Sequence, residues 1–207
     1  MLRIGIAAVV GGIVLFVWAS ISWTVIPWHM PYGIPGQDGV AQALLETGAG
    51  SGIYWLPSTD RATHAMLSPE ERKEAENASM EQSREGPAAV ILYKPSGVRP
   101  YWITMVIGFV LEVLVAAVAA FLLSMAAPAL PGFMKRVGFV VLLSVFMIFG
   151  ANLMNWNYML YPFRFTLEMA LDGLVAALLL GIVLAIIIRP SYAETDDADD
   201  FPADAEE

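Results

Sequence analysis

The sequence predicts a mainly α-helical integral membrane protein, with four transmembrane helices and a small α+β extramembrane domain between the first and second of them. Hydrophobic residues make up 57% of the 207 residues and charged residues only 15%, which is more apolar than the usual soluble domain. The apolar residues gather in four segments that are almost free of charge. A lipid bilayer is therefore the simplest environment for this chain.

The first transmembrane helix is predicted over residues 4–27. This run is apolar apart from serine and threonine, it follows Arg3, and Pro27 is unfavourable for continuing a helix. A cleaved signal peptide is the competing interpretation, because such a peptide also has an apolar run after a basic residue. We prefer the membrane helix, since the run is long and has no convincing small-residue cleavage site.

Residues 28–100 are predicted to form the extramembrane domain, because glycine, proline and charged residues recur throughout this region. Asp38 and Ser68 are expected N-caps of two helices. The expected elements are, in order, a helix at 38–48, a strand at 52–57, a helix at 68–86 and a strand at 88–93. Two strands cannot bury a core of any size, so the domain is expected to lean on the membrane helices, lipid headgroups or a partner.

The remaining apolar segments supply three more transmembrane helices. They are predicted over residues 101–126, 137–154 and 163–188. The third helix is short, and an aromatic, amide-rich stretch follows it. Residues 190–207 are predicted to be a disordered acidic tail, because positions 191–207 hold eight acidic residues and no basic one.

The basic residues that flank the helix ends indicate the orientation in the membrane. Four of them lie on the side of the two termini and three on the side of the domain: Arg3, Lys135, Arg136 and Arg189 against Lys94, Arg99 and Arg164. The positive-inside rule thus predicts cytoplasmic termini by a small margin. Residues 28–100 are then extracytoplasmic.

Residue types exclude several classes of function. The chain has no cysteine, and its two histidines, His29 and His64, lie far apart in the sequence, so thiolate chemistry and a histidine-based metal or haem site are not expected. It has no basic footprint of a nucleic-acid-binding protein. The sequence motifs of serine hydrolases, P-loop NTPases, dinucleotide-binding enzymes and zinc proteases are absent. We therefore expect no cofactor, no metal and no nucleic-acid partner.

Three acidic residues fall within the predicted membrane helices, where a charge costs about 2.5 to 3.5 kcal/mol even on the lenient scale. At about 1.5 Å per residue from the outer helix ends, Glu112 is roughly 16 Å deep and Asp172 roughly 14 Å deep. Glu168 lies one turn from Asp172 on the same helix face, at the depth of Asn152. These four residues are predicted to form one polar seam.

The seam has two interpretations. At least one of Glu112 and Asp172 is expected to be protonated at pH 7, because burial and a neighbouring like charge both disfavour the ionised carboxyl group. The functional interpretation is a proton or cation relay. The structural one is a set of hydrogen bonds between packed helices, and we favour it.

Aromatic, amide and charged side chains gather at the predicted outer ends of the helices. They are Trp23, Trp28 and His29 after the first helix, and Asn155, Trp156, Asn157 and Arg164 between the third and fourth. We interpret them as interfacial anchors or headgroup contacts. A titrating or phosphate-binding histidine, and a quinone or headgroup site in the amide-rich stretch, are the alternatives.

Residues 22–29 (SWTVIPWH), 51–57 (SGIYWLP) and 155–158 (NWNY), with Tyr161-Pro-Phe and Asp172, resemble a group of small bacterial membrane proteins. The resemblance covers most of the chain except the tail. It implies a bacterial inner-membrane protein and a shared pattern that includes Trp28, His29 and Asp172. It carries no activity with it.

Three functions remain in order of preference. The first is a non-enzymatic accessory or assembly subunit that binds a protein partner or its own copies within the lipid bilayer, because Gly11, Gly12, Gly108 and the alanines at 116–120 provide small-residue packing surfaces. The second is a small proton-coupled transporter or channel that uses Glu112 and Asp172. The third is a lipid-modifying enzyme, in which His29 and the amide-rich stretch would meet.

Overall fold

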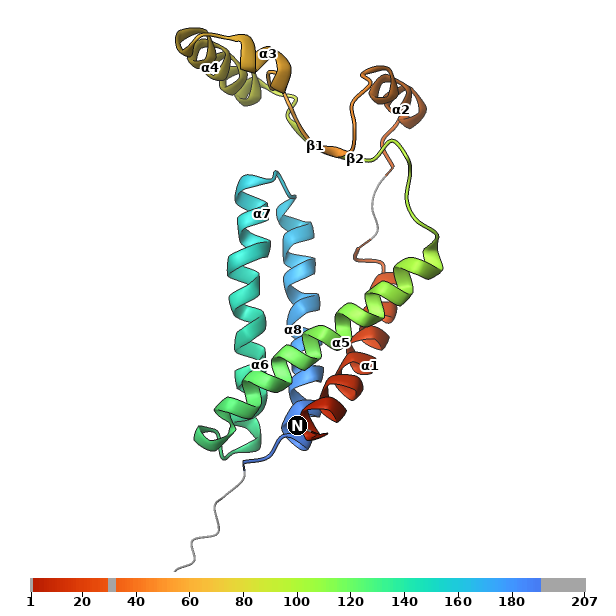
Figure 1. Ribbon diagram of the computed structural model, residues 1–207, viewed down its shortest axis with the longest axis vertical. Helices are drawn as coiled ribbons and strands as arrows, with labels where there is room; N and C mark the ends of the chain where they lie inside the picture. The colour runs from red at the N-terminus through yellow and green to blue at the C-terminus, as the bar shows by residue number, and fades with distance from the viewer. Residues whose placement is uncertain (1, 30–32, 191–207) are drawn as a thin grey trace, which may run out of the picture. The chain divides into compact units, whose positions relative to one another are not determined.

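The computed structural model describes residues 2–29 and 33–190 (Figure 1). Within these residues, four helices are long and apolar enough to cross a membrane. They are α1 (Leu2–Thr24), α5 (Tyr101–Ala126), a run that begins with α6 (Phe133–Met147), and α8 (Phe163–Ile187). The protein is therefore a mainly α-helical, multi-pass membrane protein, as the sequence predicts. The tail predicted beyond Pro190 lies outside the described residues.

The third span is longer than the expected 137–154. It begins at Phe133, passes from α6 into a π-helical turn, η2 (Ile148–Asn152), and continues as α7 (Leu153–Tyr158), for 26 residues in all. The π turn leads directly into α7, so Asn155, Trp156 and Asn157 of the amide-rich stretch are helical, whereas the sequence predicts this stretch to follow the helix. At the other end, Lys135 and Arg136 lie in the first turn of α6 rather than in a loop.

Small residues bring helices close together in the first of two compact units, which comprises residues 2–26, 105–147 and 171–190 of the described chain. A Cβ atom on Gly12 of α1 would lie 2.7 Å from the Cα atom of Val113 on α5. Gly11 faces Ala116, one of the fully buried residues of α5. The predicted packing surface is thus present at both glycines, whereas a Cβ on Gly108 would have no neighbour within 4 Å.

The second unit, residues 27–104 and 148–170, holds the extramembrane domain. Its elements are α2 (Gln37–Glu46), β1 (Gly52–Leu56), α3 (Arg61–Met66), α4 (Pro69–Glu85) and β2 (Ala89–Tyr93). The strands form an antiparallel pair, in which Gly52 lies opposite Tyr93 and Leu56 opposite Ala89. The order of two helices and two strands agrees with the sequence, and the short α3 is additional.

The two expected N-caps have different outcomes. Ser68 caps α4 in a capping box, because Glu71 N–H donates to its Oγ at 3.3 Å and its own N–H donates to Glu71 Oε2 at 2.8 Å. Hydrogen bonds from Ser68 to the Glu71 carboxyl group, from its backbone N–H first and its side chain second, hold the pKa of Glu71 below its usual value. The prediction for Asp38 is wrong, since α2 begins one residue earlier. Its N-cap is Gly36, whose φ of 71° favours glycine.

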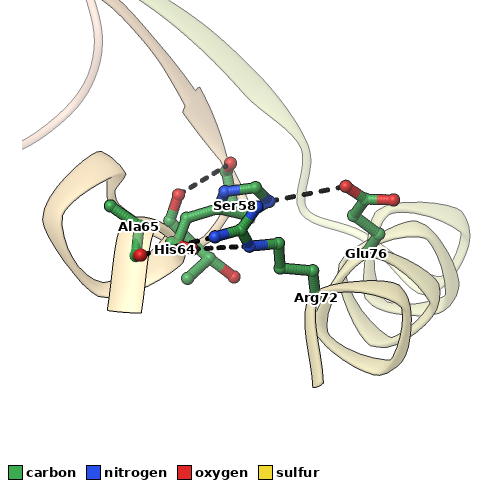
Figure 2. Close-up of polar contacts among 6 residues, drawn as sticks. Ser58, His64, Ala65, Arg72 and Glu76 are labelled. Carbon is green, nitrogen blue, oxygen red and sulfur yellow. Dashed lines mark hydrogen bonds and ion pairs between the residues drawn. The ribbon is translucent and has the colours of Figure 1, made fainter. Parts of the chain in front are cut away.

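Polar contacts join α3 to α4 (Figure 2). Arg72 Nε on α4 donates to the carbonyl oxygen of His64 at 3.1 Å, and His64 Nε2 lies 3.4 Å from Glu76 Oε1. The N-cap of α3 is Asp60, whose Oδ1 accepts from the backbone N–H groups of Ala62 and Thr63 at 3.0 Å. These contacts order a helix that is too short to be recognised from apolar periodicity.

Candidate functional site

The carboxylate of Asp172 on α8 is the centre of the candidate site. Its Oδ1 atom accepts a hydrogen bond from Trp18 Nε1 at 2.7 Å and a second from Ser22 Oγ at 2.8 Å. Both donors belong to α1, where residues four apart lie on the same helix face. Because Ser22 is fully buried, its hydroxyl is shielded from water. The two bonds therefore tie α1 to α8 within the membrane-spanning unit.

Glu112 adds a third helix, α5, to the candidate site. It is half-buried on α5, and Asp172 lies within electrostatic range of its carboxyl group. We call Trp18, Ser22, Glu112 and Asp172 the Asp172 cluster. The cluster combines two acidic groups from different helices with two hydrogen-bond donors to Asp172.

The outer residues of the predicted seam have their own local surroundings. Glu168 Oε1 lies 2.9 Å from Arg164 Nε, four residues earlier on α8, so an ion pair balances its charge. Asn152 ends the π-helical turn, and its side chain makes no capping hydrogen bond to α7. A seam that joins Glu168 and Asn152 to the Asp172 cluster stays a prediction.

The predicted interfacial residues differ in exposure. Trp23 is 50% exposed, and Trp156 is 44% exposed and packs edge-on against Phe163, with ring centroids 5.7 Å apart. Asn157 is exposed and Asn155 half-buried. Exposed tryptophans suit an anchoring role at a membrane surface.

His29 does not fit the expected headgroup contact. Its ring is only 5% exposed and lies 5.2 Å, centroid to centroid, from the ring of Trp28. Because protein covers the ring, a lipid headgroup has no open access to it. This burial argues against the headgroup contact, whereas an anchoring role for His29 and the half-buried Trp28 stays a prediction.

Three residues that hold the helices together are not among the residues predicted for the site. Trp18 and Ser22 lie within the first apolar run, where their spacing of four residues indicates one polar helix face. Arg136 was counted only as a flanking charge. It is buried, and its Nη1 atom donates to the carbonyl oxygens of Leu130 and Pro131 at 3.1 and 2.8 Å.

Arg136 also reaches the end of α8. Its Nη2 atom donates to the carbonyl oxygen of Ala185 at 3.3 Å. A cation at a helix C-terminus is favoured by the helix dipole, and carbonyl groups in the last turn lack partners within their own helix. Arg136 thus joins the turn between α5 and α6 to the last turn of α8.

The described residues contain no group of three or more His, Asp or Glu side chains placed to hold a metal ion. Searches of protein-family models, curated proteins and solved structures find no match for this chain.

Proposed function

We propose that this protein is a non-enzymatic accessory or assembly subunit of a membrane complex. The observation that carries the proposal is the exposure of the third span, Phe133–Tyr158. Only 11% of its most apolar window is buried by the rest of the chain, against 33% for α8. An apolar helix that crosses the bilayer with most of this window uncovered by its own chain offers a long surface to another chain.

The Asp172 cluster supports a packing role inside the bundle. The Oδ1 atom of Asp172 already accepts two hydrogen bonds from α1, from Trp18 and Ser22. Interhelical hydrogen bonds of this kind hold membrane helices together without any chemical step. In this proposal the Asp172 cluster fixes α1 against α8, so that the remaining faces of these two helices are held in a defined arrangement for a partner to bind.

The extramembrane domain supports the same proposal. Every residue of β1 is exposed, including the large apolar side chains of Ile53 and Trp55, and Leu92 on β2 is 69% exposed. A two-stranded sheet is marginally stable alone in water. Apolar side chains that stay uncovered on such a sheet are expected to gain stability from a partner.

The proposed setting is the inner membrane of a bacterium, with both termini in the cytoplasm and residues 28–100 outside it. The four basic residues beside the helix ends on the side of the termini support this orientation. Labelling of single cysteines introduced at Ser58 and at Ser191, in intact cells with a membrane-impermeant reagent, tests it. Labelling at Ser191 without labelling at Ser58 would contradict it.

Purification from native membranes in a mild detergent tests the assembly role. The expected result is a particle that contains other polypeptides or several copies of the 22.5 kDa chain. An unrelated four-span protein with the same tag, purified in parallel, serves as the control for non-specific association. Recovery of a lone monomer with no co-purifying protein would contradict the proposal.

A small proton-coupled transporter or channel is the second candidate, favoured by the proximity of Glu112 and Asp172 on different helices. Proton flux into liposomes that contain the purified protein tests it, with Glu112→Gln and Asp172→Asn as the variants. Asparagine keeps a carbonyl oxygen that accepts from Trp18 and Ser22, so it removes the ionisable group and leaves the packing bonds. Flux that is the same in both variants and the wild type would dismiss this candidate.

A further inference from the structure

A cavity of about 450 Å³ lies in the second unit, between β2 and the segment that joins α7 to α8. This volume is within the range of sites that bind small molecules. All of its lining residues belong to the described part of the chain, and none of them carries a charge. Tyr161 has the only polar side chain among them. The chemistry of the walls therefore fits an uncharged, apolar ligand.

One wall comes from β2 and Ala88, the residue before it; Val90 and Leu92 alternate along the strand and so share a side. In the antiparallel pair, Trp55 lies opposite Val90 and Ile53 opposite Leu92. Directly opposite residues point to the same face of a sheet. The apolar wall thus continues from the cavity across β1 as an open strip.

The other wall comes from the connection between two membrane-spanning helices. Tyr161 packs against Phe165 in the first turn of α8, with ring centroids 5.7 Å apart. Leu160 has a φ of 56°, a left-handed conformation that L side chains rarely adopt, and its side chain is 49% exposed. Backbone strain of this kind gathers at ligand-binding and other functional sites.

We propose that this cavity binds the hydrocarbon chain of a membrane lipid. The α7–α8 connection directly follows one membrane span and directly precedes the next, so it lies at the membrane boundary, where acyl chains are within reach. The uncharged lining gives an ionic headgroup no partner in the cavity, and the headgroup stays in the water-exposed interface. The proposal goes beyond the assembly role and does not depend on it.

Photo-crosslinking tests the proposal. The full-length protein is placed in liposomes of phosphatidylethanolamine and phosphatidylglycerol that contain a phospholipid with a diazirine near the methyl end of one acyl chain. After irradiation and proteolysis, mass spectrometry locates the adducts. The expected result is labelling of the β2 peptide as well as of the α7–α8 connection. A β2 peptide without adducts, while the membrane spans are labelled, would overturn the proposal.

Two variants separate binding in the cavity from chance contact. Ala88→Trp adds a large ring at a residue that lines the cavity and is expected to lower β2 labelling several-fold, whereas Ala78→Trp, the same change at a position of α4 that does not line it, is expected to leave it unchanged. Val90→Thr keeps the branched shape and adds a hydroxyl group, so it lowers labelling with little risk to the strand. The proposal would be overturned if β2 labelling stayed at the wild-type level in all three variants. It would also be overturned if Ala88→Trp and Ala78→Trp lowered β2 labelling equally.

Discussion

Replacement of Gly12 by alanine tests the close contact between α1 and α5. The new Cβ would lie 2.5 Å from Val113 Cγ2, 2.7 Å from Val113 Cα and 2.9 Å from Val113 N. Two of these atoms belong to the backbone, so a change of side-chain rotamer cannot relieve the clash, and α1 has to move away from α5. Overpacking of this kind costs about 1 to 3 kcal/mol, which opposes a gain in helix propensity of about 1 kcal/mol.

Gly5→Ala is the matched control on the same helix. A Cβ at Gly5 would have no neighbour within 4 Å, so this variant has the same gain in helix propensity without the clash. We expect Gly12→Ala to be less stable than Gly5→Ala by about 1 to 3 kcal/mol, measured by reversible unfolding in mixed micelles with circular dichroism. Equal stability of the two variants would refute the close approach of α1 to Val113.

Three further predictions concern hydrogen bonds. Ser22→Ala removes one of the two hydrogen-bond donors to Asp172. We expect the free energy of unfolding to fall by about 0.6 kcal/mol in the same assay. An unchanged free energy of unfolding would contradict a packing role for this bond. Arg136→Met leaves three carbonyl groups without their donor and is expected to lower the free energy of unfolding by about 2 kcal/mol or more. A smaller decrease than that of Ser22→Ala would argue against a role of Arg136 in joining the helices. The pKa of Glu71 in the folded chain lies below its usual 4.5, so its stabilisation of α4 is complete above that pH and is lost as the pH falls through the folded value. Circular dichroism is expected to show helix loss on acidification that is smaller in Glu71→Gln, and an identical pH profile in both proteins would exclude this contribution.

The membrane spans are predictable from sequence because a single constraint dominates them. In lipid every backbone polar group has to be satisfied internally, so an apolar segment of sufficient length becomes a helix. The ends of a span obey this constraint less strictly. The third span therefore extends beyond the expected 137–154, to Tyr158 in α7 at one end and past Lys135 and Arg136 to Phe133 at the other.

The start of α4 in the extramembrane domain is also predictable, because it depends on residues close together in the sequence. Ser68 followed three residues later by Glu71 defines the start of α4 in the sequence and in the structure. Asp38 had no such second signal, and the left-handed Gly36 takes the N-cap position instead. A single side chain that can cap a helix is therefore a weaker indication of a helix start than two residues that can form a capping box.

Only two of the four residues of the Asp172 cluster could be predicted from the sequence. Glu112 and Asp172 stand out because charges are rare in membrane spans. The hydrogen-bond donors to Asp172 are a tryptophan and a serine, which are common in such helices, and only the rotation of α1 toward α8 makes Trp18 and Ser22 its donors. That rotation depends on tertiary packing at Gly11 and Gly12, which no pattern within a single helix specifies.

The mass of the particle in its own membrane tests the assembly role most directly. Native mass spectrometry of protein ejected from membrane vesicles, without detergent exchange, measures it. The proposed function predicts particles heavier than the 22.5 kDa chain by the mass of a partner or of further copies. A single chain of 22.5 kDa carrying only lipid would contradict it.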